Sequence, residues 1–262
     1  MTGWKLPRLF APAAPDAATQ RQGPARLRID IEGVAVYAVG DVHGCLDELL
    51  ALEAIIIDDA SKLAGDRLII MPGDYVDRGP RSAQVLEHLS RPAPAGFQRI
   101  CLMGNHERFM LDYLDRRIVL ADWLTVGGLP TLLSYGIDPS GHKSDPARVD
   151  AKFRAAIPPH HVELLRTMPI LIDTGHYLFV HAGIRPGIPI DQQRDEDLLF
   201  IRKSFHDASY DLPRYVVHGH TPVEKAGRIG RRVNLDTGAF STGRLTALRI
   251  WQNRGRYLSN KH

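Results

Sequence analysis

Six short clusters along this chain each place side chains that can bind a metal ion directly after a hydrophobic run. They combine aspartate, histidine and asparagine with neighbouring glycines. The clusters are Gly40-Asp41-Val42-His43-Gly44, Gly73-Asp74-Tyr75-Val76-Asp77-Arg78-Gly79, Gly104-Asn105-His106-Glu107, His181-Ala182-Gly183, His218-Gly219-His220-Thr221-Pro222 and Asp236-Thr237-Gly238. One such cluster could arise by chance, but the ordered set indicates a shared metal centre.

The donor atoms in these clusters suit borderline divalent metals such as manganese, iron or zinc. Asp41 and His43 lie two residues apart, so a tight turn can direct both side chains to one ion. A carboxylate at Asp74 could bridge two ions. A second coordination sphere would be completed by one amide and two imidazoles, those of Asn105, His181 and His220. An asparagine among histidines favours an open site over a closed structural zinc site.

A pair of divalent ions about 3.5–4 Å apart favours displacement at phosphorus. The pair can hold a shared water, lower its pKa toward about 7, and clamp the attacking and leaving oxygens. This chemistry needs no serine or cysteine nucleophile. Cys45 and Cys101 lack the paired spacing of a zinc site, so we interpret both as buried packing residues.

The composition limits the class of partner. The 262 residues are 44% hydrophobic and 24% charged, which fits one globular catalytic domain. With 33 basic and 30 acidic residues the net charge is +3, too balanced for nucleic acid to be the main partner. No apolar run of about 18 residues predicts a membrane span, and no signal peptide is evident. We therefore expect a cytoplasmic enzyme, whose oligomeric state stays open.

Strands and helices must position these clusters. Residues 1–26, rich in alanine and proline, are interpreted as a flexible arm before a catalytic domain over 27–262. Hydrophobic runs predict strands over 34–39, 67–71 and 97–103, and later over 171–173, 177–180, 215–217, 232–235 and 245–250. Helical spacing predicts helices over 46–60, 82–89 and 107–120. Residues 121–169 are interpreted as an insertion beside the site, with helices near 146–156 and 160–166.

The order of these elements predicts the fold class. Strands alternate with helices early in the chain and are dense later, which favours an α/β domain with two packed sheets. The clusters then fall at strand ends, where a rigid sheet can direct loop side chains at one point.

The first three clusters resemble the signature blocks of the phosphoprotein phosphatase family of metallophosphoesterases, in its bacterial serine/threonine type. His181 and His220 are similar to the family's remaining histidine ligands, and the likeness spans about residues 34–250. It implies a calcineurin-like metallophosphoesterase fold, a two-sheet β-sandwich flanked by helices. It also implies two divalent metal ions, with manganese expected first and iron or zinc as alternatives.

The resemblance further implies roles for individual residues. The first metal would be held by Asp41, His43 and Asp74, and the second by Asp74, Asn105, His181 and His220. His106 resembles the general acid of the family, with Asp77 fixing its tautomer and raising its pKa. Arg78 resembles a phosphate-clamping arginine, and Arg202 a second one with a looser motif match.

Three nearby residues receive a structural interpretation. Glu107 is expected to pack at the start of a helix or to support a neighbouring residue, and not to touch substrate. His218 alternates with His220 along a strand, so it should face the other way and act structurally. Asp236 is interpreted as ending a strand. The tyrosine-bearing loop of the eukaryotic enzymes does not appear, and Asp236-Thr237-Gly238-Ala239-Phe240 stands in its place.

These observations predict a metal-dependent phosphatase that hydrolyses phosphomonoesters through a hydroxide held between the metals. Its substrates would be phosphoserine, phosphothreonine or phosphotyrosine proteins, or a small phosphomonoester. The nearest alternative is a diadenosine tetraphosphate hydrolase on the same metal core, but the residue sequence of the second and third clusters favours the phosphatase. A catalytically silent module that recognises phosphorylated partners is disfavoured by the intact pair of Asp77 and His106. The near-neutral charge does not support a nuclease.

Overall fold

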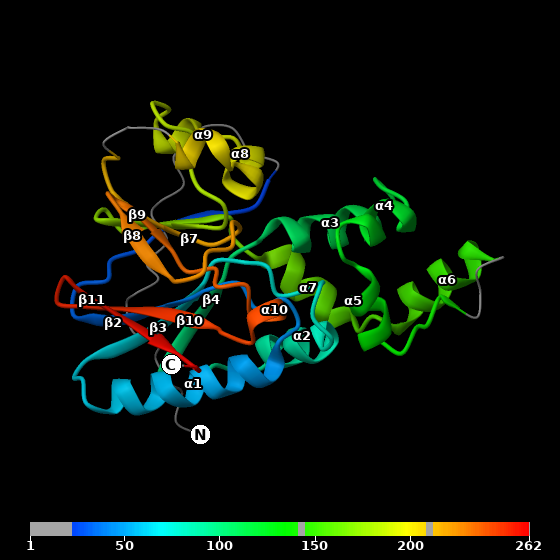
Figure 1. Ribbon diagram of the computed structural model, residues 1–262, viewed down its shortest axis with the longest axis horizontal. Coiled ribbons are helices and arrows are strands. Elements are labelled where there is room, and N and C mark those ends of the chain that lie inside the picture. The colour runs from blue at the N-terminus through cyan, green and yellow to red at the C-terminus, as the bar shows by residue number, and fades with distance from the viewer. Residues whose placement is uncertain (1–22, 141–144, 208–211, 262) are drawn as a thin grey trace, which may run out of the picture.

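The computed structural model describes residues 23–140, 145–207 and 212–261, which form two β-sheets with helices on their outer sides (Figure 1). One sheet has six strands in the order β1-β5-β6-β7-β9-β8, and the other has five in the order β11-β10-β2-β3-β4. The predicted α/β architecture of two sheets flanked by helices is therefore confirmed. Residues 1–22 of the predicted arm lie outside the described residues.

The five-stranded sheet carries the first half of the site. It contains β2 (Val34–Val39), β3 (Asp66–Met71), β4 (Phe97–Cys101), β10 (Thr246–Trp251) and β11 (Arg254–Ser259). The strands β2, β3 and β4 run parallel, and β10 pairs antiparallel with both β2 and β11. Because parallel neighbours need a crossover, α1 (Leu46–Ser61) and α2 (Ser82–Ser90) connect them.

The six-stranded sheet carries the second half. It contains β1 (Arg26–Arg28), β5 (Leu171–Asp173), β6 (Tyr177–Val180), β7 (Tyr215–His218), β8 (Gly227–Ile229) and β9 (Arg232–Asn234). Here β6, β7 and β9 run parallel. The sequence did not predict β1, β8 or β11, which are short or largely exposed and so lack a hydrophobic run.

Side chains along β2 point alternately to the two faces of its sheet, so the other sheet packs on one face and helices pack on the other. Val34, Val36 and Ala38 join the apolar layer between the sheets, whereas Tyr37 faces the helical side. The Tyr37 hydroxyl donates a hydrogen bond of 2.9 Å to Asp59 of α1. Because both faces are buried, the strand reads as one continuous hydrophobic run.

A helical extension projects to one side of the sheets (Figure 1). It contains α3 (Asn105–Leu114), α4 (Leu120–Thr125), α5 (Leu129–Ser134), α6 (Pro146–Ala156) and α7 (Pro159–Thr167). The helix predicted over 107–120 is confirmed only as far as Leu114, where α3 ends, and Arg116 has φ 60°. The predicted helices near 146–156 and 160–166 are confirmed as α6 and α7.

The remaining helices are short. They are η3 (Ile190–Gln192), α8 (Asp195–Phe200), α9 (Lys203–His206) and α10 (Ala239–Thr242). In the described ranges, no helix combines the length and apolar character needed to cross a membrane.

Candidate metal centre

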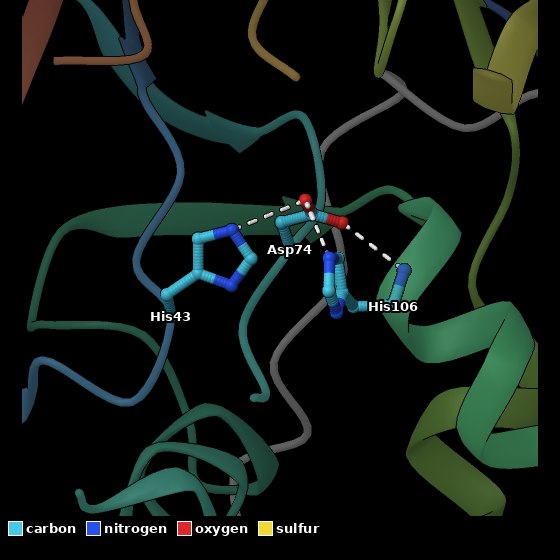
Figure 2. Close-up of side chains that lie close together, drawn as sticks. All are labelled: His43, Asp74 and His106. Carbon is cyan, nitrogen blue, oxygen red and sulfur yellow. Dashed lines mark hydrogen bonds and ion pairs between the residues drawn. The ribbon is translucent and has the colours of Figure 1, made fainter. Parts of the chain in front are cut away.

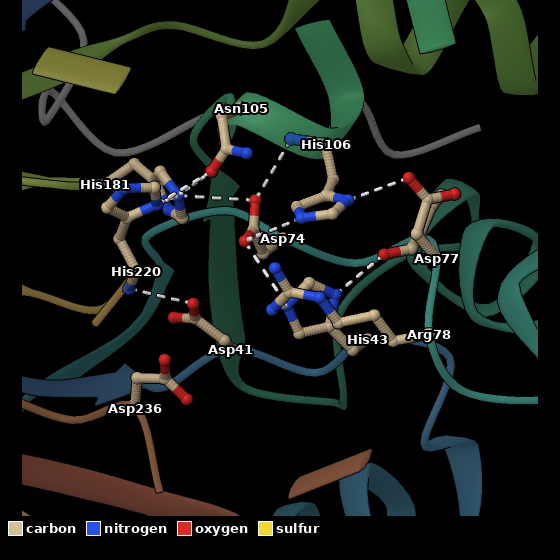
Figure 3. Close-up of polar contacts among 12 residues, drawn as sticks. Asp41, His43, Asp74, Asp77, Arg78, Asn105, His106, His181, His220 and Asp236 are labelled. Carbon is tan, nitrogen blue, oxygen red and sulfur yellow. Dashed lines mark hydrogen bonds and ion pairs between the residues drawn. The ribbon is translucent and has the colours of Figure 1, made fainter. Parts of the chain in front are cut away.

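The carboxyl ends of parallel strands from both sheets meet at one place, and the predicted ligands follow them. Asp41 and His43 follow β2, Asp74 follows β3 and Asn105 begins the helix after β4. From the other sheet, His181 follows β6 and His220 follows β7. All of these residues are buried. Figure 3 shows their side chains converging on Asp74.

Asp74 lies between two groups of histidines. Its Oδ2 is 3.3 Å from Nε2 of His43, and its Oδ1 is 3.3 Å from Nε2 of His181. His106 approaches the same side as His43, with Nε2 3.9 Å from Oδ2 (Figure 2). The carboxylate of Asp74 is therefore the one group shared by the two sides of the site.

Two groups of three side chains, one on each side of Asp74, could each hold a metal ion. His43, Asp74 and His106 form one, and Asp74, His181 and His220 form the other, with donor atoms within 4.8 Å of one another in each. His106, which was predicted to be the general acid, thus also lies close enough to His43 and Asp74 to share a metal ion with them.

Asn105 joins the second group. Its Oδ1 is 2.8 Å from Nε2 of His181 and 2.8 Å from Nδ1 of His220, and these two nitrogens are 3.1 Å apart. The side chains of Asn105, His181 and His220, which follow β4, β6 and β7, thus converge beside Asp74.

Protonation states favour cation binding. Burial alone would raise the pKa of Asp74, but His181, His106 and His43 hold it well below its usual range. Burial lowers the pKa of His181 to about 4 and that of His220 to about 2. At neutral pH the site therefore offers an ionised carboxylate and neutral imidazoles with free lone pairs.

Two further carboxylates lie at the edge of the site. Asp41 Oδ2 accepts the backbone N–H of His220 at 2.9 Å, and Asp236 Oδ1 accepts that of Gly238 at 2.9 Å. The second oxygen of each is buried without a hydrogen-bond partner. Burial, followed by the charges of Asp236 and Asp74, raises the pKa of Asp41 well above its usual range.

Asp236 is the residue that sequence reasoning underrated. It does follow β9, as predicted, but its side chain is 1% exposed and points toward Asp41 (Figure 3). The signal was present, because Asp236-Thr237-Gly238 repeats the pattern of a hydrophobic run followed by a possible ligand.

The unpartnered atoms test whether these residues fit a pair of metal ions. Two buried carboxylate oxygens here, Asp41 Oδ1 and Asp236 Oδ2, lack a hydrogen-bond partner. Buried polar atoms of this kind are costly unless a cation or a donor meets them. A Cβ at Gly219 would lie 1.8 Å from Asp41 Oδ1, so glycine is needed to admit this carboxylate. The donor set fits two divalent cations sharing Asp74.

Hydrogen bonds orient His43. Its Nδ1 lies 2.8 Å from the carbonyl oxygen of Val76, and its Nε2 lies 2.7 Å from Nη1 of Arg78. Nδ1–H must donate to the carbonyl, because a carbonyl only accepts. The Nε2 lone pair therefore faces the site, as a metal ligand requires.

A hydrogen-bonded chain holds His106. Its Nδ1 lies 2.7 Å from Asp77 Oδ2, which also accepts the indole N–H of Trp123 at 3.0 Å. Thr131 donates to Asp77 Oδ1 at 2.7 Å. Burial alone would lower the pKa of His106, but Asp74 and Asp77 raise it. Trp123 and Thr131 belong to α4 and α5, so the helical extension contacts the pair that was predicted to deliver a proton.

The two arginines lie differently. The guanidinium of Arg78 stacks over the ring of Phe240, with a distance of 5.2 Å to its centroid. Arg202 is exposed, and its Nη1 donates to the hydroxyl of Thr221 at 3.3 Å, next to His220. Arg78 is thus inside the site, whereas Arg202 lies at its rim.

The backbone of the site is strained. Positive φ angles occur at five site residues, with 43° at His43, 57° at Asp74, 70° at Asp77, 66° at Arg78 and 67° at His220. Each such conformation costs about 1–3 kcal/mol and persists only where the surrounding contacts impose it.

Glu107 imposes this conformation on one loop. Its carboxylate accepts the backbone N–H groups of Asp74 at 2.8 Å, Tyr75 at 2.7 Å, Val76 at 3.2 Å and Gly104 at 2.9 Å. The prediction that Glu107 packs at a helix start or supports a neighbour is confirmed, because it lies in the first turn of α3 and holds the segment from Asp74 to Val76.

His218 behaves as expected of a structural residue. Its Nδ1 donates to the carbonyl of Gly219 at 3.0 Å, and its ring packs edge-on against Phe205.

Comparison with known proteins places this site in a family context. The model of the calcineurin-like phosphoesterase family matches residues 34–244. The bis(5'-nucleosyl)-tetraphosphatase PrpE [asymmetrical] of Bacillus subtilis (strain 168) is 26% identical over 238 residues, which are 83% of this chain and 91% of the relative. The protein of that name from Bacillus thuringiensis (strain Al Hakam) is 29% identical over 233 residues, 80% of this chain and 88% of the relative.

Two solved structures share the fold. One, described as a "putative diadenosine tetraphosphatase", has a TM-score of 0.62 and 19% identity, over 90% of this chain and 98% of its own. The other, a cold-active protein-tyrosine phosphatase of a psychrophilic Shewanella species, has a TM-score of 0.53 and 19% identity, over 91% of this chain and 83% of its own.

Proposed function

Because this chain belongs to the calcineurin-like phosphoesterase family, and is thus a metal-dependent hydrolase, we propose that it cleaves dinucleoside tetraphosphates. The observation that carries the proposal is Asp74, whose two oxygens face separate groups of metal-binding side chains. The similarity to proteins named bis(5'-nucleosyl)-tetraphosphatase, over most of both chains, supports this substrate. The proposed substrate is therefore the one that the sequence offered as its nearest alternative, a dinucleoside tetraphosphate, in place of a phosphoprotein.

Aromatic side chains beside the site also support a nucleotide substrate. Phe240 contacts His43 edge-on at 5.5 Å between centroids, and Phe200 contacts Phe109 at 5.6 Å, which in turn lies 6.4 Å from His106. Phe240 is 40% exposed and Phe200 is 38% exposed. Stacking of a base on an aromatic ring is worth about 1–3 kcal/mol, so these rings offer binding energy that a bare phosphate could not use.

The residues of the chain would divide the work as follows. Asp41, His43 and Asp74 would hold one metal, and Asp74, Asn105, His181 and His220 the other. When bound, two such ions lower the pKa of a water and polarise phosphoryl oxygens. Arg78 and Arg202 would hold the oxygens of the attacked phosphate, since a planar guanidinium matches two of them.

His106 would complete the reaction by giving its Nε2 proton to the leaving oxygen. Asp77 accepts from Nδ1, so it keeps the imidazole oriented and stabilises its protonated form. A nucleotide is a better leaving group than a serine alkoxide and needs less protonation. His106→Asn should therefore slow hydrolysis of a phosphoserine peptide more than hydrolysis of the dinucleotide.

The decisive experiment compares substrates with one enzyme preparation. We expect kcat/KM with Mn²⁺ to be at least about 100-fold higher for diadenosine tetraphosphate than for a phosphoserine peptide, a difference of nearly 3 kcal/mol. Phe200→Ala should raise KM for the dinucleotide about tenfold, whereas Tyr257→Ala, a change at an aromatic residue that is 42% exposed on β11, should not. A preference for the peptide would reject the proposed substrate while leaving the hydrolase intact.

A further inference from the structure

A second cluster of metal-binding side chains lies on α2 and α7, which carry none of the residues of the metal centre. Glu87 comes from α2, and His160 and His161 come from the first turn of α7. Glu87 Oε2 lies 2.8 Å from Nε2 of His160 and 3.2 Å from Nε2 of His161. We propose that these three residues form a third, peripheral site for a divalent transition metal, with Zn²⁺ the best fit.

The spacing of the donors fits a small tetrahedral ion. The three donor atoms lie within 4.8 Å of one another. Around Zn²⁺, with bonds of about 2.0–2.2 Å, tetrahedral ligand atoms lie roughly 3.3 Å apart. Glu87 Oε2 therefore needs to move from each nitrogen by only a few tenths of an ångström. Two imidazoles and one carboxylate favour zinc over magnesium or calcium, which prefer oxygen ligands.

Hydrogen bonds outside the cluster already orient the ligands. His161 is 2% exposed, and its Nδ1 lies 2.7 Å from the hydroxyl of Tyr135. The carboxylate of Glu87 only accepts, so Nε2–H of His161 donates to it at 3.2 Å. A metal ion would replace that proton and leave Nδ1–H to donate to the Tyr135 oxygen, which is the arrangement of metal-binding histidines. The other oxygen of Glu87 accepts from Arg91 at 3.1 Å, which leaves Oε2 for the ion.

The site is open to solvent on one side. The side chains of His160 and Glu87 are 52% and 42% exposed, so an ion can enter and keep a water as its fourth ligand. In the sequence these histidines had no supporting pattern, because their partner lies 73 and 74 residues away. A bound ion would tie α7 to α2, whose first residue, Ser82, accepts the backbone N–H of Asp77 at 3.0 Å.

Zinc counting tests this site independently of catalysis. The protein is saturated with Zn²⁺, freed of unbound ion by gel filtration and analysed for zinc per chain. We expect His160→Gln and Glu87→Gln to hold one zinc fewer than wild type. His176→Gln, an exposed histidine on the β5–β6 turn, should hold as many as wild type.

Thermal unfolding supplies the second readout. With chelator, His160→Gln should melt at the wild-type temperature, because its side chain is half-exposed. With excess Zn²⁺, wild type should gain more stability than the variant, since binding to the folded state alone raises its free energy of unfolding. Equal zinc content and equal zinc-dependent stabilisation in wild type and His160→Gln would overturn the proposal.

Discussion

The carboxylate of Glu107 accepts the backbone N–H of Asp74 at 2.8 Å, and this contact holds the backbone of Asp74 in a left-handed conformation. Burial, followed by the charge of Asp74, raises the pKa of Glu107 to about 7, although backbone donors oppose the shift. Glu107 thus shapes the candidate metal centre without being one of its proposed ligands.

Replacing Glu107 by glutamine should weaken both the fold and the site. Glutamine keeps the shape but offers one acceptor oxygen and brings an NH₂ group against backbone donors. We expect a loss of about 1–3 kcal/mol in the free energy of unfolding and weaker metal binding, measured by urea unfolding and Mn²⁺ titration. The exposed Glu163→Gln serves as control, and wild-type behaviour of Glu107→Gln in both assays would contradict the supporting role.

Asp236→Asn should reduce metal affinity about 10–100-fold while the folded structure persists. The change removes a buried negative charge beside Asp41, which we infer to be a metal ligand. Mn²⁺ affinity can be followed by titration calorimetry, with Asp66→Asn, at an exposed start of β3, as the matched control. An affinity equal to that of wild type would return Asp236 to a purely structural role.

Trp123→Phe should alter proton delivery without disturbing the metal ligands. The indole N–H donates to Asp77, so its loss leaves that carboxylate a stronger acceptor and raises the pKa of His106. The alkaline limb of the kcat profile should move to higher pH, and kcat should fall about tenfold. Trp251→Phe on β10 controls for loss of an indole. If the alkaline limb of the kcat profile stays at the wild-type pH in Trp123→Phe, Trp123 has no role in proton transfer.

The stability of the metal-free protein should fall as pH drops below about 6.5. Burial lowers the pKa of His218 to about 3 and that of His181 to about 4, so the unfolded chain takes up protons first. Each such histidine contributes stability that is present above its unfolded pKa and is lost toward its folded pKa. The slope is about 1.4 kcal/mol per pH unit for each one.

Comparison with His218→Asn isolates one of these groups. The buried carboxyls with raised pKa values oppose the trend, but they are common to both proteins and cancel. Urea unfolding in chelator between pH 7 and 5 should show a slope smaller by about one proton in the variant. Identical slopes would mean that His218 does not stay neutral in the folded state.

Local patterns were sufficient to predict the parallel strands and the clusters after them. In β2 a buried run ends at a glycine, and the predicted ligands Asp41 and His43 follow at once, so one short segment carries both signals. The same holds for Asp74 after β3. Parallel strands bring such ends together at one edge, which is why separate segments could be assigned to one site.

The contacts of the helical extension could not be predicted in this way. Trp123 and Thr131 meet Asp77 across 46 and 54 residues, and nothing near either residue marks it as a partner. Their pairing follows from the packing of α4 and α5, which depends on tertiary contacts between rings such as Trp123 and Tyr113, 5.3 Å apart. β11 was missed for a related reason, because its exposed side chains leave no hydrophobic pattern.

The hydrogen bonds from Trp123 and Thr131 to Asp77 connect the helical extension to the residue that orients His106. A ligand or substitution that shifts α4 or α5 by even a fraction of an ångström would change how firmly the imidazole of His106 is gripped. Variation in this region would therefore alter turnover even where every predicted metal ligand is kept.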